Sequence, residues 1–91
     1  MAIVVVKLRI MPESVDTDLN ELDGKASKLI KGFGGEPGKT EITPIAFGLK
    51  SLNIFFTMPE EKGSTEELEK KIAALDGVNS AEVIDVRRAI G

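Results

Sequence analysis

The sequence predicts one small α+β domain, in which a four-stranded antiparallel sheet carries two helices on one face. The chain of 91 residues has the length for one compact core of two layers, and we expect residues 1–91 to form a single domain. Of these residues 42% are hydrophobic and 30% are charged, which is typical of globular proteins. Apolar residues alternate in some segments and recur every three or four residues in two others, which indicates strands and helices respectively.

The first two elements are a strand and a helix. Residues 3–11 are rich in β-branched side chains and alternate, as in a strand buried on one face. From Asp16, which we take as the N-cap, apolar residues follow the spacing of an amphipathic helix that ends near Gly32. The apolar positions are Val4, Val6, Leu8 and Ile10 in the strand and Leu19, Leu22, Ala26, Leu29 and Ile30 in the helix.

The middle of the chain predicts a connector followed by a β-hairpin. Residues 32–38 are rich in glycine but lack the spacing of a phosphate-binding loop, so we expect a flexible connector. Residues 39–43 are a weak strand candidate and residues 49–57 a stronger one. Proline fixes the backbone angle φ and glycine adopts positive φ, so Pro44 to Gly48 should form a rigid turn. The residues of the second strand that share a face are Leu52, Ile54 and Phe56.

One aromatic side chain, Phe47, is expected at the tip of this turn. A large apolar side chain at a tight turn is either a plug of the core or an exposed anchor. The residue pattern alone leaves both explanations open.

The second helix is predicted to follow a loop over residues 58–63. Ser64, with Glu67 three residues later, matches a capping box that starts a helix, and Asp76-Gly77 ends it. The apolar stripe of this helix is Leu68, Ile72 and Leu75.

The last strand is predicted over residues 81–86. Its register stays open, because Val83 and the pair Ile84 and Val86 compete for the inner face. The resulting order β-α-β-β-α-β is the split βαβ arrangement, so we predict a ferredoxin-like sandwich. This fold hosts enzymes, RNA binders, metal carriers and regulatory domains, and it does not decide the function by itself.

Composition argues against several classes of function. The chain has no cysteine and no histidine, so thiol nucleophiles, Ser-His-Asp relays and nearly all zinc sites are excluded. We therefore expect neither redox nor zinc chemistry, and no metal or cofactor. A net charge of −3, together with Phe55 and Phe56 that lack the basic and glycine neighbours of an RNA-binding strand, favours a protein partner over nucleic acid. We recognise neither a signal peptide nor a membrane span and expect a cytoplasmic protein.

Two adjacent arginines, Arg87 and Arg88, follow the last predicted strand. Guanidinium groups suit carboxylates and phosphates. Surface arginines are also commonly solvated or paired with nearby acids, and such an exposed pair contributes only about 0 to 1 kcal/mol. Both interpretations of this basic tail stay open.

Three motifs characterise the chain as a whole. They are Met11-Pro12-Glu13-Ser14 before an acidic helix start, Pro44-Ile45-Ala46-Phe47-Gly48-Leu49 leading into Leu52-Asn53-Ile54, and the closing Val83-Ile84-Asp85-Val86-Arg87-Arg88. In this order, and over essentially the whole chain, they resemble the archaeal elongation factor 1-beta family. The resemblance implies a ferredoxin-like guanine nucleotide exchange factor that acts on elongation factor 1-alpha, the GTPase that delivers aminoacyl-tRNA, without covalent chemistry.

The resemblance also assigns roles to residues. Phe47 aligns with an aromatic residue of eukaryotic relatives that looks like an anchor pressed into the GTPase. Eukaryotic relatives end with a lysine near the magnesium site, and Arg87 or Arg88 could supply that charge here. The residues we expect to bind the partner are Pro44, Ile45, Phe47, Gly48, Lys50, Arg87 and Arg88. The alternative is a small-molecule-binding regulatory domain of the same fold, whose signature is diffuse.

Overall fold

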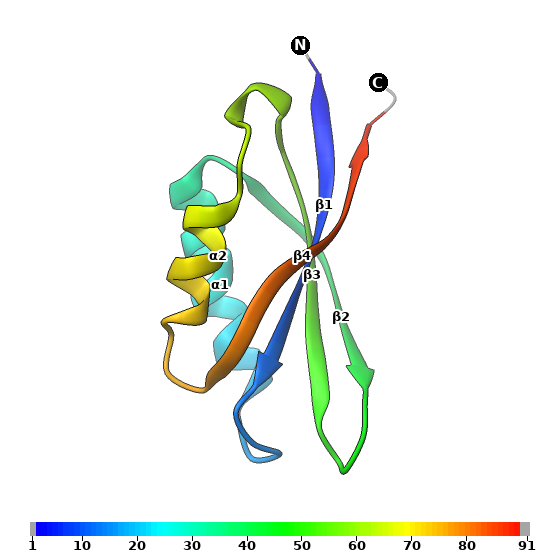
Figure 1. Cartoon of the computed structure of the whole chain (residues 1–91), viewed down its shortest axis with the longest axis vertical. Helices are drawn as coiled ribbons and strands as arrows, with labels where there is room; N and C mark the ends of the chain where they lie inside the picture. The colour runs from blue at the N-terminus through cyan, green and yellow to red at the C-terminus, as the bar shows by residue number, and fades with distance from the viewer. Residues whose placement is uncertain (1, 90–91) are drawn as a thin grey trace.

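The computed structural model of the chain describes residues 2–89 and contains one antiparallel sheet with the strand order β2-β3-β1-β4. Both helices lie on one face of this sheet (Figure 1). The ferredoxin-like prediction is therefore confirmed. The elements are β1 (Ile3–Pro12), α1 (Leu19–Phe33), β2 (Glu36–Pro44), β3 (Lys50–Pro59), the 3-10 turn η1 (Glu60–Lys62), α2 (Glu66–Ala73) and β4 (Val78–Arg88).

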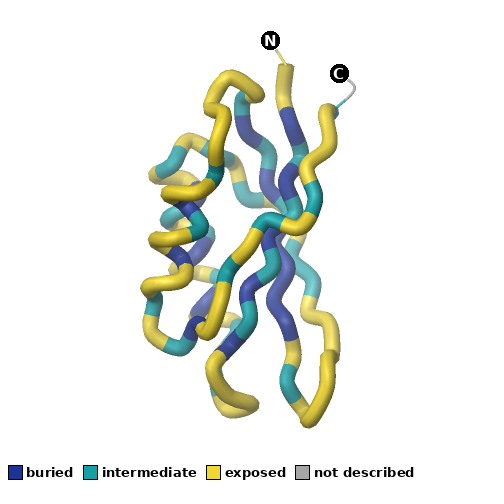
Figure 2. The backbone as a smooth tube through the Cα atoms, in the orientation of Figure 1, coloured by how far each residue is buried: buried dark blue, intermediate teal, exposed yellow. Residues whose placement is uncertain are grey.

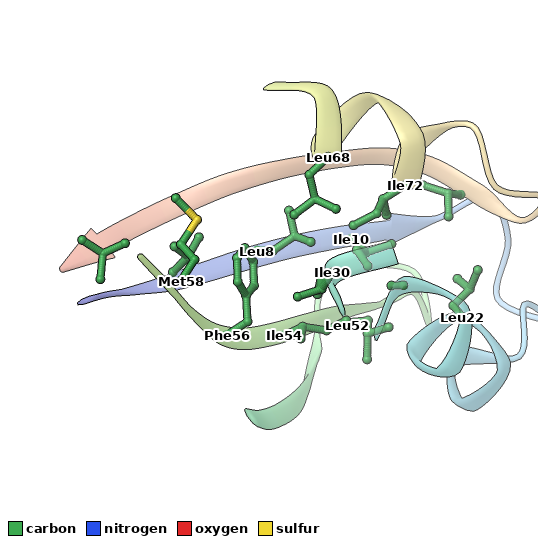
Figure 3. Close-up of a cluster of buried hydrophobic side chains, with 14 residues drawn as sticks. Leu8, Ile10, Leu22, Ile30, Leu52, Ile54, Phe56, Met58, Leu68 and Ile72 are labelled. Carbon is green, nitrogen blue, oxygen red and sulfur yellow. The ribbon is translucent and has the colours of Figure 1, made fainter. Parts of the chain in front are cut away.

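The core lies between the helices and the two central strands, β1 and β3. Alternation along β1 puts Val6 and Leu8 on the helix face, where they pair with Phe56 and Ile54 of β3. These side chains meet the buried stripes of α1 and α2 (Figure 3). The buried apolar residues are Val4, Val6, Leu8, Ile10, Leu22, Ala26, Ile30, Leu52, Ile54, Phe56, Met58, Leu68, Ile72 and Val78.

The start of α1 differs from the prediction, because Asp18 and not Asp16 is the N-cap. A carboxylate oxygen of Asp18 accepts hydrogen bonds from the N–H groups of Asn20 (3.0 Å) and Glu21 (3.2 Å). Asp16 is held in a preceding turn, where its N–H donates to the Ser14 hydroxyl (3.2 Å). Two aspartates two residues apart offer the same capping chemistry, so the sequence pattern did not separate them.

The predicted connector over residues 32–38 is wrong in its second half. The helix ends at Phe33 and is capped by Gly34, with φ of +107°, and β2 begins at Glu36, which pairs with Thr57. An irregularity between Pro37 and Thr40 lets the strand pass through this segment. The neighbouring strand β3 extends to Pro59, beyond the predicted end, and its last two residues, Met58 and Pro59, pair with Val4 and Ile3 of β1.

The predicted capping box at Ser64 and Glu67 is also wrong. The helix α2 begins at Glu66, and its cap residue, Thr65, makes no side-chain capping bond. Ser64 accepts a hydrogen bond from the N–H of Glu66 instead (3.1 Å). The carboxylate of Glu69 accepts from the Thr65 hydroxyl (3.0 Å) and from the backbone N–H of Val83 (3.1 Å), so it ties α2 to the edge strand β4.

The register of β4 shows why its pattern was ambiguous. Val83 pairs with Leu8 and Val86 pairs with Val6, so both valines lie on the helix side of the sheet. An irregularity at this point leaves Ile84 as an extra residue between them. A strict alternation cannot place Val83 and Val86 on one face, whereas a bulge can.

The opposite face of the sheet has no helix over it. Here Phe55 lies between Lys7 and Lys39, whose ammonium groups are 5.3 and 5.9 Å from the centre of its ring. The two adjacent phenylalanines therefore have different roles, because Phe56 is buried in the core. No helix in the described part of the chain is both long and apolar enough to cross a membrane.

Phe56→Ala should lower the free energy of unfolding by about 3–5 kcal/mol, because it leaves a cavity between α1 and the sheet. Phe47→Ala, at a fully exposed phenylalanine, should change it by less than about 0.5 kcal/mol. Urea unfolding followed by circular dichroism measures both. Equal losses in the two variants would contradict the assignment of the core.

Candidate functional site

The turn between β2 and β3 is closed by backbone hydrogen bonds. Ile45 donates to the carbonyl of Leu49 (2.8 Å), and Leu49 donates to the carbonyl of Ala46 (3.0 Å). Pro44 and Lys50 form the last pair of the two strands. Inside this frame, Phe47 and Gly48 both adopt positive φ, at +57° and +78°. Five of the predicted site residues, Pro44, Ile45, Phe47, Gly48 and Lys50, are thus brought together.

The side chain of Phe47 is exposed, with 96% of its surface accessible to solvent. Of the two explanations left open by the sequence, the plug of the core is wrong, and the role of an anchor stays a prediction. A left-handed backbone costs a residue with a side chain about 1–2 kcal/mol, and packing in the core does not compensate for this cost here. Strain of this kind commonly marks a functional position.

Other exposed apolar side chains lie on the hairpin and on the loop that contacts it. Ile42 and Ile45 of the hairpin are 48% and 49% exposed, and Val15, in the loop after β1, is 59% exposed. A methyl carbon of Val15 would lie 3.5 Å from a Cβ atom at Gly48, so this loop contacts the turn. Val15 and Ile42 are not among the predicted site residues, and for Val15 the reason is that a single valine in a polar loop carries no periodic signal.

Arg87 and Arg88 lie on opposite faces of the sheet, because neighbouring strand residues alternate. Arg87 is on the open face, where its Nε donates to the carboxylate of Asp85 (2.9 Å). Arg88 is on the helix side, where its Nη2 donates to the carboxylate of Glu60 in η1 (2.5 Å). This hydrogen bond and the charge of Glu60 raise the pKa of Arg88 above its ordinary value. Its side chain is nevertheless 70% exposed.

Backbone hydrogen bonds fix the position of this second end. The N–H of Glu60 donates to the carbonyl of Ala2 (2.9 Å), and the N–H of Ala89 donates to the carbonyl of Ile3 (2.8 Å). The start of β1 therefore holds both η1 and the end of β4. The backbones that carry Glu60 and Arg88, whose side chains form an ion pair, are thus held next to each other.

The hairpin turn and the two arginines lie at opposite ends of the molecule. The molecule measures 42 × 22 × 17 Å, and the two clusters lie at the two ends of its long axis (Figure 1). The hairpin end is largely exposed (Figure 2). The predicted site residues therefore form two separate clusters, and a single pocket cannot contain both.

No metal-binding cluster of three or more acidic, histidine or cysteine side chains occurs within residues 2–89. At the hairpin end an aromatic side chain projects among aliphatic ones, and at the other end two guanidinium groups are available to anionic groups.

A family model for the EF-1 guanine nucleotide exchange domain matches residues 5–89. Curated relatives named elongation factor 1-beta match over nearly the whole chain. The protein of Methanosarcina barkeri is 43% identical, with 97% of this chain and 99% of the relative covered. The protein of Staphylothermus marinus is 44% identical, with 97% of this chain and 98% of the relative covered.

Solved structures resemble the chain in fold. The ACT domain from the GTP pyrophosphokinase of Chlorobium tepidum superposes with a TM-score of 0.58 at 17% identity, covering 88% of this chain and 96% of that domain. The chain entitled BlrP1 BLUF gives a TM-score of 0.57 at 15% identity, covering 98% of this chain and 56% of that one. These likenesses confirm the ferredoxin-type sandwich and carry no statement about function.

Gly48→Ala should lower the free energy of unfolding by about 1 kcal/mol, because alanine is strained at its positive φ. Gly24→Ala is the matched control, since Gly24 lies on an exposed part of α1 with open space around its Cα. There the same substitution should stabilise the chain by about 0.5–1 kcal/mol. Thermal unfolding of the two variants should show shifts of opposite sign, and shifts of one sign would argue against the turn geometry.

Proposed function

Because the chain belongs to the family of EF-1 guanine nucleotide exchange domains, we propose that it docks on elongation factor 1-alpha through both of its ends. Family membership makes it a guanine nucleotide exchange factor of translation elongation. The proposal concerns the partner, the residues that contact it and the way in which they act. Exchange in this scheme requires binding alone and no covalent step.

The mechanism follows from thermodynamic linkage. An exchange protein that binds the nucleotide-free GTPase more tightly than the loaded GTPase weakens nucleotide binding by the ratio of these two affinities. A coupling of about 1–3 kcal/mol would weaken GDP binding roughly 5- to 150-fold. GDP then leaves faster, and abundant GTP enters the vacated site. The exchange factor itself needs a rigid surface that fits the empty state.

The observation that carries the proposal is the exposure of Phe47 on a closed and strained turn. Two backbone hydrogen bonds fix the turn, so binding immobilises little additional backbone. Aromatic side chains that fill a pocket of the partner are frequent hot spots, and their truncation costs about 2 kcal/mol or more. Ile45 and Lys50 lie beside Phe47 and extend the contact.

At the opposite end we assign the cationic contact to Arg88. Its guanidinium is oriented by Glu60 and remains largely exposed, so further N–H donors are free to meet phosphate or carboxylate groups. Such a cation would compete with magnesium for the anionic groups of the nucleotide site. Because the molecule is 42 Å long, the two contacts would fall on well-separated parts of the GTPase.

The intact chain, in substoichiometric amounts, should speed the release of fluorescent GDP from elongation factor 1-alpha. Phe47→Ala should raise the concentration needed for half-maximal release about 30-fold, the equivalent of about 2 kcal/mol. Stopped-flow fluorescence against excess GTP measures both quantities. An intact, folded chain without effect on release would overturn the proposal, and a fully active Phe47→Ala variant would overturn the anchor.

Arg88→Ala should slow maximal GDP release more than tenfold, because the cation acts at the nucleotide site and not in the initial docking. Arg87→Ala removes an equal charge from the other face of the sheet and should change the maximal rate less than threefold. The same stopped-flow assay at saturating factor separates them. If Arg87→Ala is the slower variant, the assignment of the two arginines has to be exchanged.

A further inference from the structure

A groove lies between the loop after β1, the start of α1 and the β2–β3 hairpin. It has a volume of about 340 Å3, and its lining includes Val15, Leu19, Ile42, Gly48 and Lys50. Ile42 and Lys50 lie on the helix side of the sheet, where their strands extend past the start of α1. Gly48 belongs to the turn that carries Phe47, so this turn forms part of the groove's wall.

Some apolar side chains that line this groove are exposed to solvent. Val15 and Ile42 come from segments far apart in the sequence, and both are about half exposed. Together with Ile45 and Phe47 they account for four of the seven large hydrophobic side chains that are exposed within the described residues. Exposed apolar side chains gathered in one place are typical of an interaction surface.

The charges around the groove indicate what would complement it. The carboxylate of Asp18, which also lines the groove, is already used by the first N–H groups of α1. Lys50 is exposed and forms no ion pair with any residue of the described chain. The groove thus combines the aliphatic side chains of Val15, Leu19 and Ile42 with neutral polar ones, those of Ser14, Thr17 and Asn20, and with one cation that has no ion pair among the described residues. This chemistry fits an apolar side chain that has a carboxylate beside it.

We propose that this groove is a socket for an apolar side chain of the elongation factor GTPase, with a neighbouring acidic residue of the GTPase paired to Lys50. The inference rests on the proposed function, because Phe47 is the chain neighbour of Gly48, which lines the groove, so a GTPase that covers Phe47 lies next to the groove. The hairpin end then binds the GTPase through the projecting side chain of Phe47 and through the groove next to it. The loop after β1 becomes part of the docking surface, although neither its sequence nor the turn motif indicates this.

Val15→Thr and Ile42→Thr test the socket, because threonine retains the β-branched shape and adds a hydroxyl that an apolar occupant cannot satisfy. Each should raise the concentration for half-maximal GDP release about three- to tenfold and leave the maximal rate and the melting temperature unchanged. Lys50→Glu should raise it further at low salt, and this additional effect should shrink at high salt. Ile84→Thr, at an exposed isoleucine on β4, is the control and should behave like the intact chain.

The outcomes separate this inference from the function on which it rests. If the intact chain does not speed GDP release, the proposed function fails and the socket with it. If the intact chain and Phe47→Ala behave as expected but both groove variants match Ile84→Thr, only the socket is overturned. If the groove variants lower both the maximal rate and the melting temperature, Val15 and Ile42 stabilise the fold and do not bind the partner. If the intact chain is a dimer and the groove variants are monomers, the groove is occupied by a second copy of the chain. Either result overturns the proposal.

Discussion

The arrangement of this molecule depends on the pairing of β1 with β3 in the centre of the sheet. Successive side chains of a strand point to opposite faces, so that the pairs Val6 with Phe56 and Leu8 with Ile54 both face the helices. The buried stripes of α1 and α2 can close over only one face. Once that face is chosen, the directions of the hairpin and of the closing strand are determined as well.

The separation of the two candidate binding clusters is a consequence of this topology. The turn lies where β2 ends and β3 begins, and the arginines lie where β4 ends beside the start of β1. Because β1 and β3 are antiparallel, the start of β1 lies beside the end of β3, at the far end from the turn. A rigid sheet therefore fixes the spacing between an aromatic and a cationic group without any long linker.

Periodicity in the sequence was sufficient to predict the order of the elements, the inner faces of β1 and β3 and the turn itself. The residue types did not determine the start of α1, because Asp16 and Asp18 offer equivalent caps. They did not determine the register of β4 either, because the bulge at Ile84 permits Val83 and Val86 to share a face. Phe47 was identifiable as unusual from its position in the turn, yet only the folded chain shows that it is exposed. Val15 lies beside the turn only in the folded chain, where its side chain approaches Gly48.

The tie between Glu69 and the backbone of Val83 has a consequence for the solution behaviour of the molecule. An outer strand normally offers a row of free N–H and C=O groups to any other extended chain, which is the first step of edge-to-edge aggregation. Here a carboxylate already occupies one of these N–H groups, and the bulge at Ile84 interrupts the regular spacing next to it. A strand from another chain therefore does not find a regular row of free hydrogen-bonding groups at this part of β4.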